Sequence, residues 1–259
     1  MAFRSSLAAA VMAALLSASP AFAGSDVDAP KDTAKEIAAA VAVEPSAPAP
    51  APISTLDVPA DGADGVDTGA GVNLGLPAEG KPTVVGNTAI YESDDASNSS
   101  VAVQAVGGGV RALINIDSAD APERYDFPLS GDVVSLQAQP DGSVLTIGAD
   151  GVPNGVIDAP WARDKAGRDV PTHYEINGTT LTQVIEHRAG SYTYGITADP
   201  SWVSDAKWLL SKCLGLTFGS DITLRALFPN IQSAAKFVIR RLGVWGALWC
   251  GGGIISAAL

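Results

Sequence analysis

Two histidines, His173 and His187, offer the most versatile acid–base and metal chemistry in this sequence, which contains no third histidine. Their segment predicts a β-hairpin in which the two rings lie on opposite faces, and this disfavours a shared zinc ion. His173 beside Glu175 or Glu186 could act as an acid–base pair, whereas a solvated cross-strand contact is the simpler interpretation. The sequence therefore assigns no catalytic, cofactor-binding or metal-binding residue.

Other patterns that could support chemistry are weak. Asp61, Asp64 and Asp67 recur at every third position, whereas an EF-type calcium loop needs acids at every second position and a late glutamate. Trp161 suits a sugar-stacking platform, and a tryptophan buried at the end of a β-sandwich explains it as well. Paired carboxylates of the glycosidase kind stay open, because 28 acidic residues offer many pairs.

Cys213 and Cys250 are the only cysteines, so an exported chain can form a single intramolecular disulfide between them. Two reduced, buried thiols are the alternative. Both cysteines lie in the last segment, residues 200–259, whose charge differs from that of the rest. Residues 206–259 contain six bases and one acid, whereas residues 24–205 contain nine bases and 27 acids.

The same segment predicts a disulfide-closed helical tail with a basic face and an uncharged last 18 residues. A helix of that length spans about 27 Å, just short of a hydrocarbon core. One interpretation is a hairpin that contacts an anionic membrane or another envelope component. The other is a small helical unit packed on itself or on the β domain. The residues expected to contact lipid or a partner are Trp202, Trp208, Lys236, Arg240, Arg241, Trp245 and Trp249.

The N-terminus has the pattern of a secretory signal peptide over residues 1–23. Arg4 precedes an uncharged apolar run from Leu7 to Leu16, and an Ala-Phe-Ala cleavage site ends at Ala23. The alternative is an N-terminal membrane anchor, for which the apolar run is short. We expect a protein that is secreted or held in the cell envelope.

After this leader the composition predicts two further parts. Residues 24–82 predict a weak helix over Asp32–Val43, followed by an Ala/Pro- and Asp/Gly-rich linker that is extended or disordered. Residues 83–199 contain short alternating runs with turn signals every 8–12 residues, which is typical of an all-β sandwich or barrel. The fold class is therefore α+β, with a β domain followed by the helical tail.

The clearest local signal is a hairpin around Asn177-Gly178, the preferred pair for a type I′ turn. With a two-residue loop at that pair, Ile176 faces Thr179 and Tyr174 faces Leu181. The residues expected to share the core face are Tyr174, Ile176, Leu181 and Ile185.

Residues from about Val101 to Trp202 resemble a β-rich module of uncharacterised secreted actinobacterial proteins. The phrases that carry the resemblance are Ala121–Pro128, Ile157–Asp164, Pro171–Tyr174, Leu181–Val184 and Ala198–Pro200. The resemblance implies an exported β module with a variable, Cys-containing helical tail. It implies no activity and no catalytic residue.

The overall charge of −12 disfavours nucleic-acid binding, because an acidic surface repels phosphate. The leading hypothesis is an exported, non-enzymatic protein whose acidic β domain carries a membrane-active tail of toxin or bacteriocin character. The alternative is an envelope or surface interaction protein with a purely structural tail, and a hydrolase is the third hypothesis. The oligomeric state is open.

Overall fold

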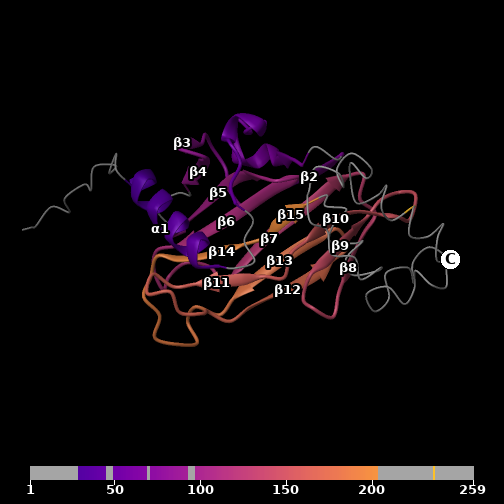
Figure 1. Ribbon diagram of the computed structural model, residues 1–259. Coiled ribbons are helices and arrows are strands. Elements are labelled where there is room, and N and C mark those ends of the chain that lie inside the picture. The colour runs from indigo at the N-terminus through magenta and orange to yellow at the C-terminus, as the bar shows by residue number, and fades with distance from the viewer. Residues whose placement is uncertain (1–28, 45–48, 69–70, 93–96, 204–235, 237–259) are drawn as a thin grey trace, which may run out of the picture.

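The computed structural model describes residues 29–44, 49–68, 71–92, 97–203 and 236 (Figure 1). The predicted signal peptide and the predicted Cys213–Cys250 disulfide lie outside these residues. Within them the chain forms two antiparallel β-sheets and one α-helix, so the expectation of a β-rich domain is confirmed.

The larger sheet has ten strands. Its main path is β3 (Thr83–Val85), β4 (Thr88–Glu92), β5 (Ser99–Val106), β6 (Gly109–Ile116), β15 (Ser201–Val203), β10 (Pro153–Ile157), β9 (Val144–Ile147) and β8 (Ser135–Ala138). Two further strands, β14 (Ile196–Asp199) and β11 (Trp161–Arg163), pair with each other, and β14 also pairs with β6.

The smaller sheet has five strands in the order β1 (Val66–Asp67), β2 (Val72–Leu74), β7 (Arg124–Gly131), β13 (Thr180–Ile185) and β12 (Thr172–Asn177). Both sheets are open, so the barrel alternative is not formed.

One hydrophobic cluster lies between the sheets. Alternation along β6 directs Val110, Ala112 and Ile114 into this cluster. Along β7 the alternate residues Tyr125, Phe127 and Leu129 point into it as well. The intervening residues of β6 point to the opposite face of the larger sheet. That face is also buried, and it carries both apolar and polar side chains.

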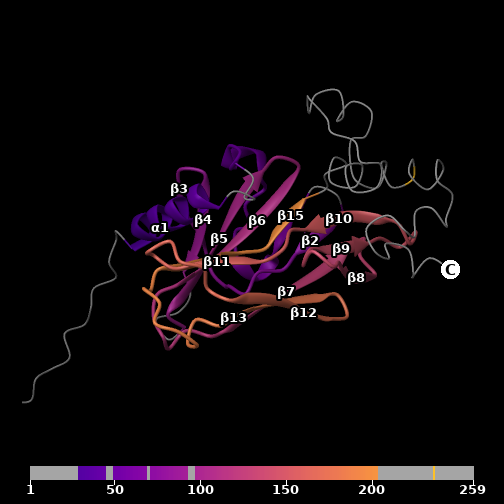
Figure 2. The same cartoon turned by 60° about the horizontal axis from the view of Figure 1, so that its bottom comes forward.

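The helix α1 (Ala29–Val43) covers the part of this outer face that lies over β3, β4, β6 and β14 (Figure 2). Its fully buried Ile37 packs against Ile90 of β4, Ala102 of β5 and Leu113 of β6. The predicted helix over Asp32–Val43 is thus confirmed. Its apolar stripe is stabilised by the sheet rather than by helix propensity alone.

The stretch expected to be a disordered linker is largely part of the fold. Val66 and Leu74 are fully buried in β1 and β2. The proline-rich segment also packs on the sheet, because Pro50 forms a bridge with Val106 and the Tyr91 hydroxyl donates to the Pro59 carbonyl at 2.8 Å. A few apolar residues are enough to anchor this stretch, because each one is buried in a core formed with distant parts of the chain.

The β domain also extends beyond residue 199. β15 lies between β6 and β10, and Trp202 is fully buried in the core cluster. Its indole ring lies against Gly155 of β10, where an added Cβ would collide with the ring. The predicted boundary at residue 199 is therefore too early, because Ser201–Val203 belong to the β domain.

The predicted hairpin forms, but its register differs from the expectation. Asn177 pairs with Thr180 and Ile176 with Leu181, so the loop residues are Gly178 and Thr179. Gly178 has φ of 61° while Asn177 and Thr179 have negative φ, which is the pattern of a type II′ turn with glycine in the first central position. The partner changes by two residues, so the four residues expected in the core still share one face of the hairpin. The expected core placement is wrong for Ile176, which is 37% exposed near the end of the edge strand, whereas Leu181 and Ile185 are fully buried.

Trp202→Ala should cost about 3–5 kcal/mol of unfolding free energy, because it leaves a large cavity between β6 and β10. Urea denaturation of the full chain measures this cost. Val134→Ala is the control, since Val134 is 59% exposed, and it should change stability by less than about 0.5 kcal/mol. Equal stability of the two variants would contradict the placement of Trp202.

Gly178→Ala should cost about 1–2 kcal/mol, the strain of a left-handed backbone, since an added Cβ meets no neighbouring atom there. Asn177→Ala should be nearly neutral, because Asn177 is an exposed strand residue with ordinary φ. A type I′ turn would make both substitutions costly, so thermal melts of the two variants distinguish the registers.

Candidate functional site

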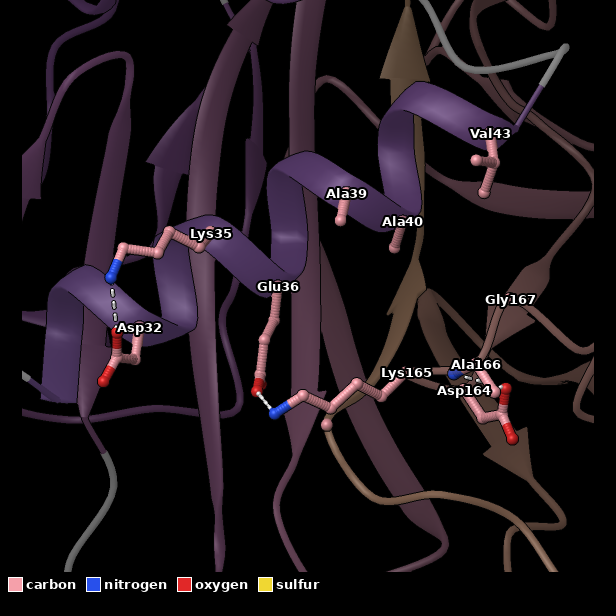
Figure 3. Close-up of a pocket in the computed structure, with 11 residues that line it drawn as sticks. Asp32, Lys35, Glu36, Ala39, Ala40, Val43, Asp164, Lys165, Ala166 and Gly167 are labelled. Carbon is pink, nitrogen blue, oxygen red and sulfur yellow. Dashed lines mark hydrogen bonds and ion pairs between the residues drawn. The ribbon is translucent and has the colours of Figure 1, made fainter.

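A groove of about 770 Å³ opens between α1 and the loop that follows β11 (Figure 3). One wall is the helix and the other is the loop, with Gly195 completing the lining. The residues that line it are Asp32, Lys35, Glu36, Ala39, Ala40, Val43, Asp164, Lys165, Ala166, Gly167 and Gly195.

Glu36 is the central group of the groove. The Lys165 ammonium donates to its Oε1 across the groove at 2.7 Å (Figure 3). Its Oε2 accepts from the Asn115 side-chain amide at 3.4 Å, and the same nitrogen donates to Asp117 Oδ1 at 2.7 Å. Gly195 allows this approach, since a Cβ at that position would lie 2.9 Å from Glu36 Oε2.

Asp117 does not line the groove, but it shares the Asn115 amide with Glu36 and has a raised pKa. Asp117 as a whole residue is exposed, but partial desolvation of its carboxyl raises its pKa to about 6, and the negative charges of Glu36 on α1 and Glu92 on β4 act in the same direction. The hydrogen bond from Asn115 and the charge of Lys165 oppose the rise. Two carboxylates thus meet on one amide nitrogen, and a lysine compensates the one on the helix.

The loop that supplies Lys165 is fixed by Asp164. Its carboxylate is fully buried and accepts backbone hydrogen bonds from Ala166, Arg168 and Thr193 at 2.8–3.0 Å. It also pairs with the Arg168 guanidinium. These bonds lower the pKa of Asp164 against the opposing effect of desolvation, which is the largest single influence. The polar contacts of the groove therefore help to hold α1 on the sheet.

A second polar cluster is buried on the same outer face, at the end of β14. Asp199 is 1% exposed, and its Oδ2 accepts from the Ser201 hydroxyl at 2.6 Å. The backbone carbonyl of Asp199 accepts from the Tyr174 hydroxyl at 3.3 Å. Arg111, also fully buried, donates to Gln104 Oε1 through Nε at 3.2 Å and Nη2 at 2.6 Å.

Burial raises the pKa of Asp199 to about 7. The nearby Asp158 adds to this rise, whereas the Ser201 hydroxyl, the Arg111 charge and Trp161 act against it. Its Oδ1 atom is buried without a hydrogen-bond partner among the described residues. Other buried side-chain atoms of the described residues, among them Tyr125 Oη and Trp202 Nε1, are in the same state, so the unpaired oxygen gains meaning only from the groups around it.

Of the seven residues expected to contact lipid or a partner, the structure describes two. Trp202 does not face outward: the expectation is wrong for this residue, because β15 inserts it into the core. Lys236 is half exposed, and its ammonium lies 3.0 Å from Asp150 Oδ2 in the turn between β9 and β10. The residues outside the described part are Trp208, Arg240, Arg241, Trp245 and Trp249.

The histidines are placed as follows. His173 is exposed and lies 3.7 Å from Glu175 of its own strand β12 and 3.8 Å from Glu186 beyond the end of β13, so both contacts are solvated. His187 is fully buried, with Nε2 3.1 Å from the Pro122 carbonyl and Nδ1 3.3 Å from the Tyr194 hydroxyl. Trp161 is half-buried in β11 against the small cluster under α1.

Sequence reasoning missed Glu36, Asp117 and Asp199. Glu36 and Asp117 are 81 residues apart in the chain and meet only because α1 crosses β6. Asp199 does carry a signal, since it precedes a proline at the end of the predicted β domain, but a proline there equally indicates the end of a strand.

The chain matches no family model, no curated protein and no solved structure with which it was compared. Among the residues that the structure describes, no group of three His, Cys, Asp or Glu side chains could hold a metal ion. No helix in this described part is long and apolar enough to cross a membrane. Function must therefore be argued from charge and geometry.

Asp117→Asn should stabilise the protein at neutral pH but not at pH 4. The unfolded carboxyl has a pKa of about 3.9, so between pH 4 and 6 the folded state binds more protons and loses stability as the pH rises. Thermal melts from pH 4 to 7.5 measure the difference between variant and wild type. Asp120→Asn, at an exposed position, is the control, and a difference that is constant across this range would contradict the shift.

Proposed function

We propose that this is an exported, non-enzymatic protein whose acidic β domain holds and neutralises a basic, membrane-active tail of toxin or bacteriocin character. The observation that carries the proposal is the ion pair between Lys236 of the tail and Asp150 of the β domain. It is the contact that the opposite charges of the two parts call for.

The charge distribution supports the same proposal. Acids outnumber bases 27 to nine in residues 24–205, whereas bases outnumber acids six to one in residues 206–259. The field of the domain therefore attracts the tail as a whole. The Lys236–Asp150 pair is partly exposed, with side-chain exposures of 48% and 39%, so it contributes at most about 1 kcal/mol. Such a contact holds the tail reversibly.

The second candidate is an envelope interaction protein with a structural tail. In this version the proline-rich stretch would act as a spacer that holds the domain away from the envelope. Pro50 and Pro59 pack on the sheet instead, and a segment docked on the domain cannot serve as a free spacer. This version would need another part of the chain to reach the envelope.

Export is tested by N-terminal sequencing of the protein recovered from the medium or the envelope. The mature chain should begin at Gly24, after the Ala-Phe-Ala site. A chain that keeps Met1 or Ala2 would contradict the proposal.

The tail is tested with dye-loaded vesicles. The oxidised peptide 204–259 should release dye from anionic vesicles more than from neutral ones, and high salt should suppress the release. The full mature chain should release less dye, because the domain occupies the basic face.

Asp150→Asn in the full chain should raise dye release by up to about fivefold, the equivalent of about 1 kcal/mol. Asparagine keeps an oxygen for the Val152 backbone N–H, which Asp150 accepts at 3.1 Å, so the turn is preserved. Glu79→Gln removes an exposed charge elsewhere and is the control. An oxidised peptide without salt-sensitive activity would leave only the structural tail.

A further inference from the structure

The Asp199–Pro200 peptide bond lies inside the larger sheet, at a place where proline is unfavourable. β14 ends at Asp199 and β15 begins at Ser201, and both pair with β6 in one continuous register. The Pro200 carbonyl accepts from the Ala112 N–H at 3.0 Å, but proline has no N–H to return. Prolines in sheets are normally confined to edges and bulges. This position therefore sacrifices a ladder hydrogen bond.

The side chain of Asp199 can also attack this peptide bond. An aspartyl carboxyl can reach its own carbonyl carbon by closing a five-membered ring, and carboxylates act as nucleophiles in proteins. The amide nitrogen of proline is tertiary and leaves as a secondary amine once it is protonated. Asp199–Pro200 is the only Asp-Pro pair in the chain.

Only one oxygen of the Asp199 carboxyl accepts a hydrogen bond from Ser201. Its Oδ2 accepts from the Ser201 hydroxyl at 2.6 Å, which fixes the group near the backbone that follows. Its Oδ1 is buried without a hydrogen-bond partner among the described residues. That oxygen is the nucleophile of the pair, and the Trp161 side chain on the neighbouring strand β11 is a polar neighbour of the same carboxyl.

The carbonyl of the same residue has a donor in place. The Tyr174 hydroxyl donates to the Asp199 carbonyl oxygen at 3.3 Å, which is where negative charge would develop during attack. Burial raises the pKa of Tyr174 well above its ordinary value, so the hydroxyl keeps its proton at neutral pH. Tyr174 therefore occupies the position of an oxyanion donor.

We propose that the folded chain cleaves itself between Asp199 and Pro200. A bond forms from a carboxyl oxygen of Asp199 to its own carbonyl carbon, and the bond from that carbon to the Pro200 nitrogen breaks. The carboxyl proton passes to the nitrogen, so Pro200 leaves as a secondary amine and Asp199 becomes a cyclic anhydride. Water then opens the anhydride to two carboxyl groups.

The environment of Asp199 keeps that proton available. Burial raises its pKa to about 7, against the opposing influence of Ser201, Arg111 on β6 and Trp161 on β11. Asp158, which follows β10, adds to the rise. The rate should therefore be constant at acidic pH and fall as the pH rises above about 7.

Cleavage would not by itself release the tail. β15 stays paired with β6 and β10, and Trp202 stays buried, whether or not residue 200 is joined to residue 199. The nicked protein would keep its tail until β15 withdraws. The argument for cleavage depends on the geometry around Asp199 and Pro200 and not on what the tail does. If the tail is membrane-active as proposed, cleavage would be the first step of its release.

The test is mass spectrometry of the folded mature chain, incubated at pH 5 to 8 and denatured just before measurement. We expect two fragments, one ending at Asp199 and one beginning at Pro200, and N-terminal sequencing of the second should start with proline. The fragments should still elute together from a gel-filtration column before denaturation. A full-length chain after several days at pH 5 to 7, or equal cleavage of the chain kept in 8 M urea throughout, would overturn the proposal.

Two variants separate catalysis from folding. Pro200→Ala keeps the carboxyl and removes the favourable leaving group, so it should abolish fragment formation. Tyr174→Phe keeps the ring and removes only the hydroxyl, and it should slow cleavage by about 100-fold or more. Tyr192→Phe is the matched control and should cleave at the wild-type rate. Near-ultraviolet circular dichroism confirms that each variant is folded, and a folded Tyr174→Phe chain that cleaves at the wild-type rate would refute the oxyanion donor.

The outcome is separable from that of the vesicle experiment, which uses a synthetic tail. An intact chain with an active tail peptide would overturn the cleavage and leave the proposed function standing. A cleaved chain with an inactive peptide would do the reverse.

Discussion

The pairing of one stretch, Ile196–Val203, with strand β6 holds the larger sheet together. This stretch lies along β6 as β14 and then as β15, without a change of register. On its other side β14 pairs with β11 and β15 pairs with β10. It therefore joins the ribbon β3–β4–β5–β6 to the ribbon β10–β9–β8. Where the two ribbons join, Trp202 fills the space above Gly155. The burial of its ring stabilises this junction.

The central strands β5 and β6 of the larger sheet are buried on both faces, and the two faces differ in chemistry. The inner face is apolar and packs against the smaller sheet. The outer face carries buried polar residues, among them Gln104, Arg111 and Asn115, which need hydrogen-bond partners because water is excluded. Neighbouring strands and α1 supply many of these partners. The helix is thus held partly by Ile37 and partly by the bonds of Glu36 to Asn115 and Lys165.

Local patterns predicted what depends on local physics. Alternation located strands such as β6 and β7, the Ala-rich run located α1, and Asn177-Gly178 located a hairpin within one residue. The register failed because the glycine alone takes positive φ, so the turn begins one residue later than the Asn-Gly preference indicates.

The misplaced parts all depend on distant partners. Val66 and Leu74 sit in a polar, glycine-rich stretch, and only the completed smaller sheet gives them a core to enter. Trp202 illustrates a deeper ambiguity, since the same amphipathic side chain suits a membrane interface and a protein interior. Its neighbours in sequence belong to the basic tail, whereas its neighbours in space are β6 and β10. Composition could therefore not decide between the two.

Two unfavourable features coincide at the Asp199–Pro200 dipeptide. Pro200 interrupts a ladder that is otherwise in register, and the neighbouring carboxyl is buried with one oxygen unpaired. An ordinary strand residue at position 200 would restore the hydrogen bond, and a neutral side chain at position 199 would avoid the cost of burying an acid. Sequences are locally consistent with their folds except where function imposes a conflict. The sheet tolerates this conflict because the bonds on either side, from Ile196 to Ala198 and from Ser201 to Val203, hold the backbone in place. Those bonds need no covalent link between the two strands, so the junction of the two ribbons is also the place where the chain could be opened without opening the fold.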